Sequence, residues 1–125
     1  MTGRVTGIGG FFFRAKDPAA IKQWYFDMFG VQLTPDNYED APWRTEAGTT
    51  VFEPFPEDTE YFGDKSVGWM INFRVDDLAA VTKRLTDAGH AIEHEGDFPN
   101  GRFAKLHDPE GNAIQLWEPG GKDPG

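Results

Sequence analysis

The sequence predicts an α+β fold in which two βαβββ modules form a cup-shaped curved sheet with the helices outside. Three observations predict this fold class. The order of strand-like and helix-like patterns in the first half recurs in the second half. Each half contains one helix-like segment that begins after an aspartate. The last hairpin has one aliphatic face and one polar and aromatic face, as expected for a sheet covered by helices on one side only.

The first half begins with residues 5–15, an apolar run with three glycines that predicts a strand buried on both faces. Asp17 and Pro18 are typical of a helix start, and Gly30 is typical of a helix end. An apolar stripe at three- and four-residue spacing supports the helix between them. Its members are Ile21, Trp24, Tyr25, Met28 and Phe29. Three further strands are predicted, at residues 31–33, 43–46 and 49–53.

Residues 55–67 combine turn-forming and acidic residues, and predict a connector between the halves. A strand at residues 69–75 follows, and Asp77 predicts the N-cap of a second helix. The apolar stripe of that helix consists of Leu78, Val81, Leu85 and Ala88, and Gly89 ends it. A strand at residues 91–95 and a hairpin at residues 103–117 complete the second half. The glycine- and proline-rich residues 120–125 predict a flexible tail.

The hairpin turns at Asp108-Pro109-Glu110-Gly111-Asn112, where the proline presets φ and the glycine accepts a positive φ. Alternation along the returning strand places Ala113, Gln115 and Trp117 on one face, and Ile114 and Leu116 on the other. The aliphatic face suits a helix. The face with the amide and the indole suits a ligand.

Four matches between the halves indicate an internal repeat. They pair Phe13-Arg14-Ala15 with Phe73-Arg74-Val75, Asp17 with Asp77, Gly30 with Gly89, and Val51-Phe52-Glu53-Pro54 with Leu116-Trp117-Glu118-Pro119. We therefore interpret the chain as a single domain, 1–125. Its parts are a first module at residues 4–54, a connector at 55–67, a second module at 68–119 and a flexible tail at 120–125.

Composition restricts the classes of partner. The formal net charge of −9, from 12 basic and 21 acidic residues, argues against a nucleic-acid partner. No apolar run approaches the length of a membrane span, and no signal peptide is recognised. The lack of cysteine excludes a disulfide framework, a thiolate metal site and a cysteine nucleophile. We expect a soluble cytoplasmic protein with neither a nucleic-acid nor a membrane partner.

These motifs resemble the vicinal oxygen chelate superfamily, which includes glyoxalase I, extradiol dioxygenases, and fosfomycin- and bleomycin-resistance proteins. The resemblance rests on the βαβββ repeat, on Trp24-Tyr25 before Phe29-Gly30, and on the turn motif followed by Ile114-Gln115-Leu116. It covers residues 5–119. It implies a small-molecule ligand or substrate, and a homodimer with cups near or across the interface.

The resemblance also implies four positions for the ligands of a divalent metal ion. In this chain those positions hold Gly10, Thr50, Met70 and Gln115. The set contains no histidine and no carboxylate, whereas a divalent ion in a dry cup needs charged or strongly donating ligands. We therefore expect no metal and no other cofactor. Binding of a divalent metal through other residues is the alternative.

The predicted cup face supplies candidates for ligand binding, which are aromatic, polar and basic. They are Phe12, Arg14, Trp43, Phe52, Met70, Asn72, Arg74, Gln115 and Trp117. They predict that the protein binds a small apolar or aromatic, possibly anionic, molecule. The arginines are suited to a carboxylate or phosphate. The same aromatic side chains would equally serve as the core of a cup filled by the protein itself.

An enzyme is the alternative interpretation. His107 shares a strand face with Phe103 and Lys105, and a histidine there suits general acid–base catalysis near pH 7. Such an enzyme would be a lyase, an isomerase or a dioxygenase, with His107 and Lys105 as candidate catalytic residues or with a recruited divalent metal. The other interpretation of His107 is a residue at the rim of the cup. A third possibility is a structural or regulatory interaction module.

Overall fold

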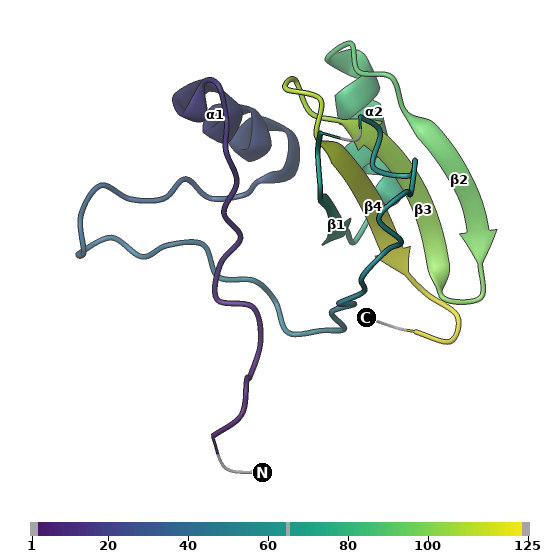
Figure 1. Ribbon diagram of the computed structural model, residues 1–125, viewed down its shortest axis with the longest axis horizontal. Helices are drawn as coiled ribbons and strands as arrows, with labels where there is room; N and C mark the ends of the chain where they lie inside the picture. The colour runs from purple at the N-terminus through teal and green to yellow at the C-terminus, as the bar shows by residue number, and fades with distance from the viewer. Residues whose placement is uncertain (1–2, 65, 124–125) are drawn as a thin grey trace.

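The computed structural model describes residues 3–64 and 66–123, which form two helices and one four-stranded sheet (Figure 1). The elements in chain order are α1 (Pro18–Phe29), β1 (Met70–Arg74), α2 (Leu78–Asp87), β2 (Glu93–Phe98), β3 (Gly101–His107) and β4 (Ala113–Pro119). The strand order is β1-β4-β3-β2, with β1 parallel to β4 and the other pairs antiparallel. The α+β class is confirmed, and β1 to β4 with α2 form the second βαβββ module.

Both helices begin where the local sequence predicts, and α1 ends at Gly30 as predicted, but α2 ends at Asp87, so that Ala88 of the predicted apolar stripe is an exposed C-cap. The side chains of Asp17 and Asp77 cap α1 and α2 by accepting hydrogen bonds from the backbone N–H groups three residues further on, at 3.1 and 3.0 Å. Gly30 ends α1 in the left-handed conformation, at φ 71°. Ile21 and Tyr25 of α1 are buried, and Leu78, Val81 and Leu85 of α2 face the same core.

The sheet has two faces of different chemistry. Ile114 and Leu116 of β4 are fully buried against the helices, together with Ala104 and Leu106 of β3. Gln115 and Trp117 alternate with them and point to the opposite face. Figure 1 shows α2 behind the sheet and the connector crossing in front of it. The division of the hairpin into a helix face and a second, polar face is therefore confirmed.

A buried carboxylate joins α1 to the turn between β3 and β4. Asp108 accepts a hydrogen bond from the Tyr25 hydroxyl at 2.7 Å and from the backbone N–H groups of Glu110 and Asn112, both at 2.9 Å. The Asn112 side chain donates a fourth, at 2.8 Å. Burial, followed by the hydrogen bond to Asp108, raises the pKa of the Tyr25 phenol. The aspartate of the turn motif thus places the first helix on the sheet of the second module.

The strands predicted in the first half require a correction. In residues 3–64, α1 is the only regular element, and residues 5–15, 31–33, 43–46 and 49–53 have no ladder partner. Figure 1 shows both flanks of α1 running away from the sheet as open chain. A strand exists only when a neighbour takes up its N–H and C=O groups, whereas a capped helix satisfies its own. The first module therefore contributes its helix as the only regular element of residues 3–64.

The connector and the tail pack against the second module as far as they are described. Residues 55–64 form turns in which the Phe55 ring contacts the Phe62 ring, with centroids 5.1 Å apart and planes tilted by 45°. The predicted flexible tail is held up to Asp123, because Gly120 and Lys122 donate backbone hydrogen bonds to Asn100 and Pro99. Lys65 of the predicted connector and the last two residues of the tail lie outside the described residues.

No helix in the described part of the chain is long and apolar enough to cross a membrane.

Replacing Tyr25 with phenylalanine tests the link between α1 and the turn. The variant loses a hydrogen bond to a buried carboxylate, and we expect it to lower the free energy of unfolding by about 1.5–3 kcal/mol. Tyr38→Phe is the matched control, because the Tyr38 side chain is fully exposed. Urea unfolding followed by circular dichroism gives both values. Equal stabilities for the two variants would contradict the role assigned to this hydrogen bond.

Candidate functional site

The candidate site lies on the face of the sheet opposite the helices, which we call the cup face. Its side chains come from all four strands and are Met70, Asn72, Arg74, Glu95, Phe103, Lys105, His107, Gln115 and Trp117. Strand register brings them together. Asn72 and Lys105 flank Gln115 on neighbouring strands, and Arg74 and Phe103 flank Trp117. Five of the predicted ligand-binding residues are thereby on one surface: Met70, Asn72, Arg74, Gln115 and Trp117.

Gln115 is the centre of a polar network. Its amide oxygen accepts a hydrogen bond from the Asn72 side chain at 2.7 Å. Its amide nitrogen donates to the Tyr61 hydroxyl at 3.1 Å and to Glu95 at 3.2 Å. The Tyr61 hydroxyl in turn donates to the other oxygen of Glu95. Each polar group of the network therefore has a partner, and Glu95 brings the only carboxylate that contacts Gln115 among the described residues.

Glu95 reaches the cup face by alternation along β2, because Glu93, two residues earlier, is paired with Lys105 of that face. The register between β2 and β3 then shifts between His94 and Gly96, so that Glu95 lies in a β-bulge. Bulges are common beside binding sites. No motif in the sequence assigned a role to Glu95. The one available signal was Gly96, which interrupts a strand and has φ 102° in the structure.

Tyr61 enters the cup face from the connector. The Lys105 ammonium lies 3.9 Å from the centroid of the Tyr61 ring and also donates to the Tyr61 backbone carbonyl. Burial, followed by the hydrogen bond to Glu95, raises the pKa of the Tyr61 phenol. Sequence analysis missed this residue too, because the approach of a connector to a sheet depends on its conformation. The cup face is therefore partly occupied by the protein's own side chain.

An aromatic wall borders the network. Trp117 and Phe103 lie parallel, with ring planes 3° apart and centroids at 6.2 Å, and Phe98 meets Phe103 edge-on. Trp117 is only 3% exposed, and its indole N–H donates to the carbonyl of Asn100 at 2.9 Å. The Trp117 ring is therefore the buried part of the wall. Phe103 is half-buried, and its ring is accessible to a ligand.

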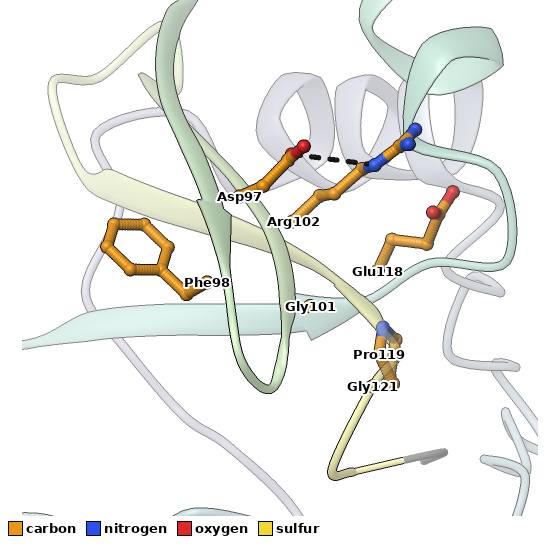
Figure 2. Close-up of a pocket in the computed structure, with 8 residues that line it drawn as sticks. Asp97, Phe98, Gly101, Arg102, Glu118, Pro119 and Gly121 are labelled. Carbon is orange, nitrogen blue, oxygen red and sulfur yellow. Dashed lines mark ion pairs between the residues drawn. The ribbon is translucent and has the colours of Figure 1, made fainter.

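A shallow depression of about 290 Å³ lies outside the cup face, at the end of the β2–β3 hairpin. The Asp97 and Arg102 side chains line it and point toward one another (Figure 2), and their charged atoms are 3.5 Å apart. Both side chains are exposed, and an exposed ion pair contributes little. The depression is open to solvent and lacks the buried polar network that the cup face has. We therefore place the candidate site on the cup face and not in this depression.

The aromatic candidates of the first half are not brought to the cup face. Phe12 and Phe52 are 92% and 88% exposed, and Arg14 and Trp43 are also exposed. They lie on the segments that lack a strand partner, so no sheet directs their side chains inward. Arg74 is on the cup face, but its guanidinium donates to the carbonyls of Glu46 and Ala47, at 2.9 and 3.4 Å. This arginine holds a first-half segment in place.

The four family positions do not suit a divalent metal ion. Gly10 has no side chain, Thr50 is exposed on an unpaired segment, and Met70 offers a thioether. The Gln115 amide is already engaged on both its oxygen and its nitrogen. Glu95 adds one carboxylate, but one carboxylate and one amide do not form a site for a hard cation. In the described residues no group of three histidine, aspartate or glutamate side chains is arranged around a common centre.

The two candidate catalytic residues, His107 and Lys105, differ in burial. His107 is exposed at the rim, where its ring lies close to Gly63 of the connector. Lys105 is half-buried and engaged with Tyr61. The two side chains share a strand face, as predicted, and the rim position of His107 agrees with the second interpretation of that residue.

Comparison with known proteins gives a family and two similar folds. Residues 10–117 match the family of glyoxalase-like domains. The crystal structure of TnmS3, an antibiotic-binding protein from Streptomyces sp. CB03234, covers 93% of this chain and 98% of its own, at 24% identity and a TM-score of 0.64. A glyoxalase/bleomycin resistance protein from the same organism covers 83% and 93%, at 25% identity and a TM-score of 0.55. No curated protein sequence matches the chain.

The raised pKa of Tyr61 is measurable by titration. The difference in phenolate absorbance between the wild type and Tyr61→Phe isolates this residue, and we expect its midpoint above the ordinary value for tyrosine. In Glu95→Gln the midpoint should move back towards that value, because the acceptor loses its charge. A midpoint at the ordinary value, or one that is unaffected by Glu95→Gln, would contradict the burial of this phenol against Glu95.

Proposed function

The chain belongs to the family of glyoxalase-like domains, and we propose that it binds a small apolar or aromatic molecule, with or without an anionic group, on the cup face. The observation that carries this proposal is the network around Gln115, which sets an amide, a carboxylate and an ammonium beside an aromatic wall. Ligand sites combine apolar walls with a few fixed polar groups in this way. Family membership and the likeness to a glyoxalase/bleomycin resistance protein are compatible with such a role.

We propose that this binding needs no metal ion. The support is the chemistry of the four family positions, of which only Met70 and Gln115 lie on the sheet. A thioether is a soft ligand, and an amide carries no charge to balance a divalent ion. Gln115 is better suited to hold an organic ligand by hydrogen bonds.

We further propose that the functional unit is a homodimer. Large apolar side chains of the first half are exposed on unpaired segments, including Val5, Phe12, Val51 and Phe52. The strand β1 is at the edge of its sheet, so its outer N–H and C=O groups are available for pairing. A second copy of the chain offers segments of matching length and pattern, because the two halves share a repeat. Pairing between copies would bury these side chains and extend the cup.

Naphthoate is a suitable probe of the binding function, because it is aromatic and anionic. We expect it to raise the melting temperature of the wild type in a concentration-dependent manner, with or without EDTA. Gln115→Ala should weaken the apparent affinity by about three- to tenfold, the range for one neutral hydrogen bond. The control is Gln32→Ala, at an exposed glutamine remote from the sheet strands in sequence.

Two results would contradict this proposal. A melting temperature unaffected by naphthoate would argue against an aromatic site, and an equal affinity in Gln115→Ala and Gln32→Ala would place the probe away from the cup face. A response that EDTA abolishes would instead show that a metal takes part.

Sedimentation equilibrium tests the proposed dimer. We expect the wild type to have twice the 14.0 kDa mass of one chain at micromolar concentration. The double variant Phe12→Asp and Phe52→Asp should have the mass of one chain, because burial of two carboxylates in the interface is costly. Tyr38→Asp, at another fully exposed aromatic, should keep the mass of the wild type. A wild type with the mass of one chain would overturn the proposal.

A further inference from the structure

The cup face has a built site around a phenol ring, and the ring that fills it belongs to Tyr61. Three contacts define the site. The hydroxyl donates to Glu95 and accepts from the Gln115 amide, and the ring lies over the Lys105 ammonium. All three partners are on the sheet, in β2, β4 and β3 respectively. Tyr61 alone comes from the connector.

Two of the three partners, Gln115 and Glu95, are held in place independently of Tyr61. Asn72 orients the Gln115 amide by donating to its oxygen at 2.7 Å, so that its nitrogen points towards Glu95. Alternation along β2 brings Glu95 to the same point, where it accepts the hydrogen bond from the Gln115 amide. Protein groups that are already ordered can bind a ligand of matching geometry without the free-energy cost of ordering them first.

The connector depends on Tyr61 for its attachment to the sheet. Within residues 54–64, every hydrogen bond to a strand is made by Tyr61, through its hydroxyl or its backbone carbonyl. The other hydrogen bonds of this segment are local, such as Thr59 to Pro56 and Gly63 to Glu60. Most of its side chains are exposed. Withdrawal of this one side chain would therefore leave the sheet and its core unchanged.

We propose that the cup-face site recognises a phenol, a hydroxylated aromatic ring, and that Tyr61 is an internal occupant which such a ligand replaces. This inference rests on the proposed function and narrows it to a ligand class. A ligand hydroxyl would donate to Glu95 and accept from Gln115, and the aromatic ring would cover Lys105.

Other ligand chemistries fit this position less well. A carboxylate would meet the negative charge of Glu95 at the point where Tyr61 now donates a hydrogen bond. A cationic amine would be repelled by Lys105. A hydrocarbon ring would fill the space but leave one Glu95 oxygen and one Gln115 N–H without their present partner, which is costly for polar groups shielded from water. An anionic group of the ligand would have to lie elsewhere on the cup face.

Tyr61→Ala allows a direct test with phenol itself, because the substitution removes a phenol ring and keeps the methyl group. We expect Tyr61→Ala to bind phenol at least tenfold more tightly than the wild type does, since the tethered ring no longer competes. It should also prefer phenol to benzene by about tenfold, as expected for a hydrogen bond to a charged acceptor. A titration followed by NMR, with the Gln115 side-chain amide as reporter, measures both.

A second substitution separates the role of Glu95 from mere cavity filling. In the background of Tyr61→Ala, Glu95→Ala should reduce the preference for phenol over benzene at least threefold. Glu57→Ala, which removes an exposed carboxylate of the connector, should leave that preference unchanged. If Tyr61→Ala does not unfold cooperatively, Tyr61→Phe replaces it. That variant keeps the ring but not the hydroxyl, and should bind phenol at least threefold more tightly than the wild type.

The outcomes distinguish this inference from the proposed function. If naphthoate stabilises both the wild type and Tyr61→Ala while phenol binds both equally, the aromatic-binding function stands and the phenol site is wrong. If phenol and benzene bind Tyr61→Ala equally, the cavity is apolar and the inference is also overturned. If neither phenol nor naphthoate binds any variant, the proposed function fails together with it.

Discussion

The buried carboxylate of Asp108 is the interaction on which the rest of the structure depends. It binds two backbone N–H groups of the turn between β3 and β4, and the Asp108 N–H donates to the Asn112 carbonyl at 2.9 Å. These bonds fix the register of the hairpin. A slip of one residue would move every side chain of β4 to the opposite face, with Gln115 among the helices and Leu116 in the cup. The same carboxylate holds α1 through Tyr25.

The two faces of the sheet follow from this register. One face packs against the helices, and the other carries the candidate site. The helix face is mainly apolar, its centre in β3 and β4 is fully buried, and it supplies the stability. The cup face carries polar groups that are costly to bury unless each has a partner. The network of Asn72, Gln115, Tyr61 and Glu95 meets this condition within the chain. Because the Tyr61 side chain provides hydrogen-bond partners for Glu95 and Gln115, the site is stable without a ligand. A ligand with the same hydrogen-bonding groups can take the place of that side chain.

The sequence was sufficient where structure is local. Asp17, Gly30 and Asp77 define the helices because caps act over a few residues, and alternation along β4 predicted the two faces. It was insufficient where structure depends on a partner. The first-half strands have no neighbour in this chain, so Phe12 and Phe52 are exposed and do not line the cup. Glu95 was missed because the sequence of one strand does not show which of its faces lies beside Gln115, and Tyr61 because the path of a connector leaves no periodic pattern.

The most direct test of the account is to locate the bound ligand by NMR, with the backbone and side-chain amides of the wild type assigned and naphthoate added to saturation. The account predicts that the largest shifts occur at Gln115, Lys105 and Phe103, with the Gln115 side-chain amide among them. Shifts centred on Asp97 and Arg102, with the Gln115 side chain unaffected, would move the site to the depression at the end of the hairpin and contradict the account.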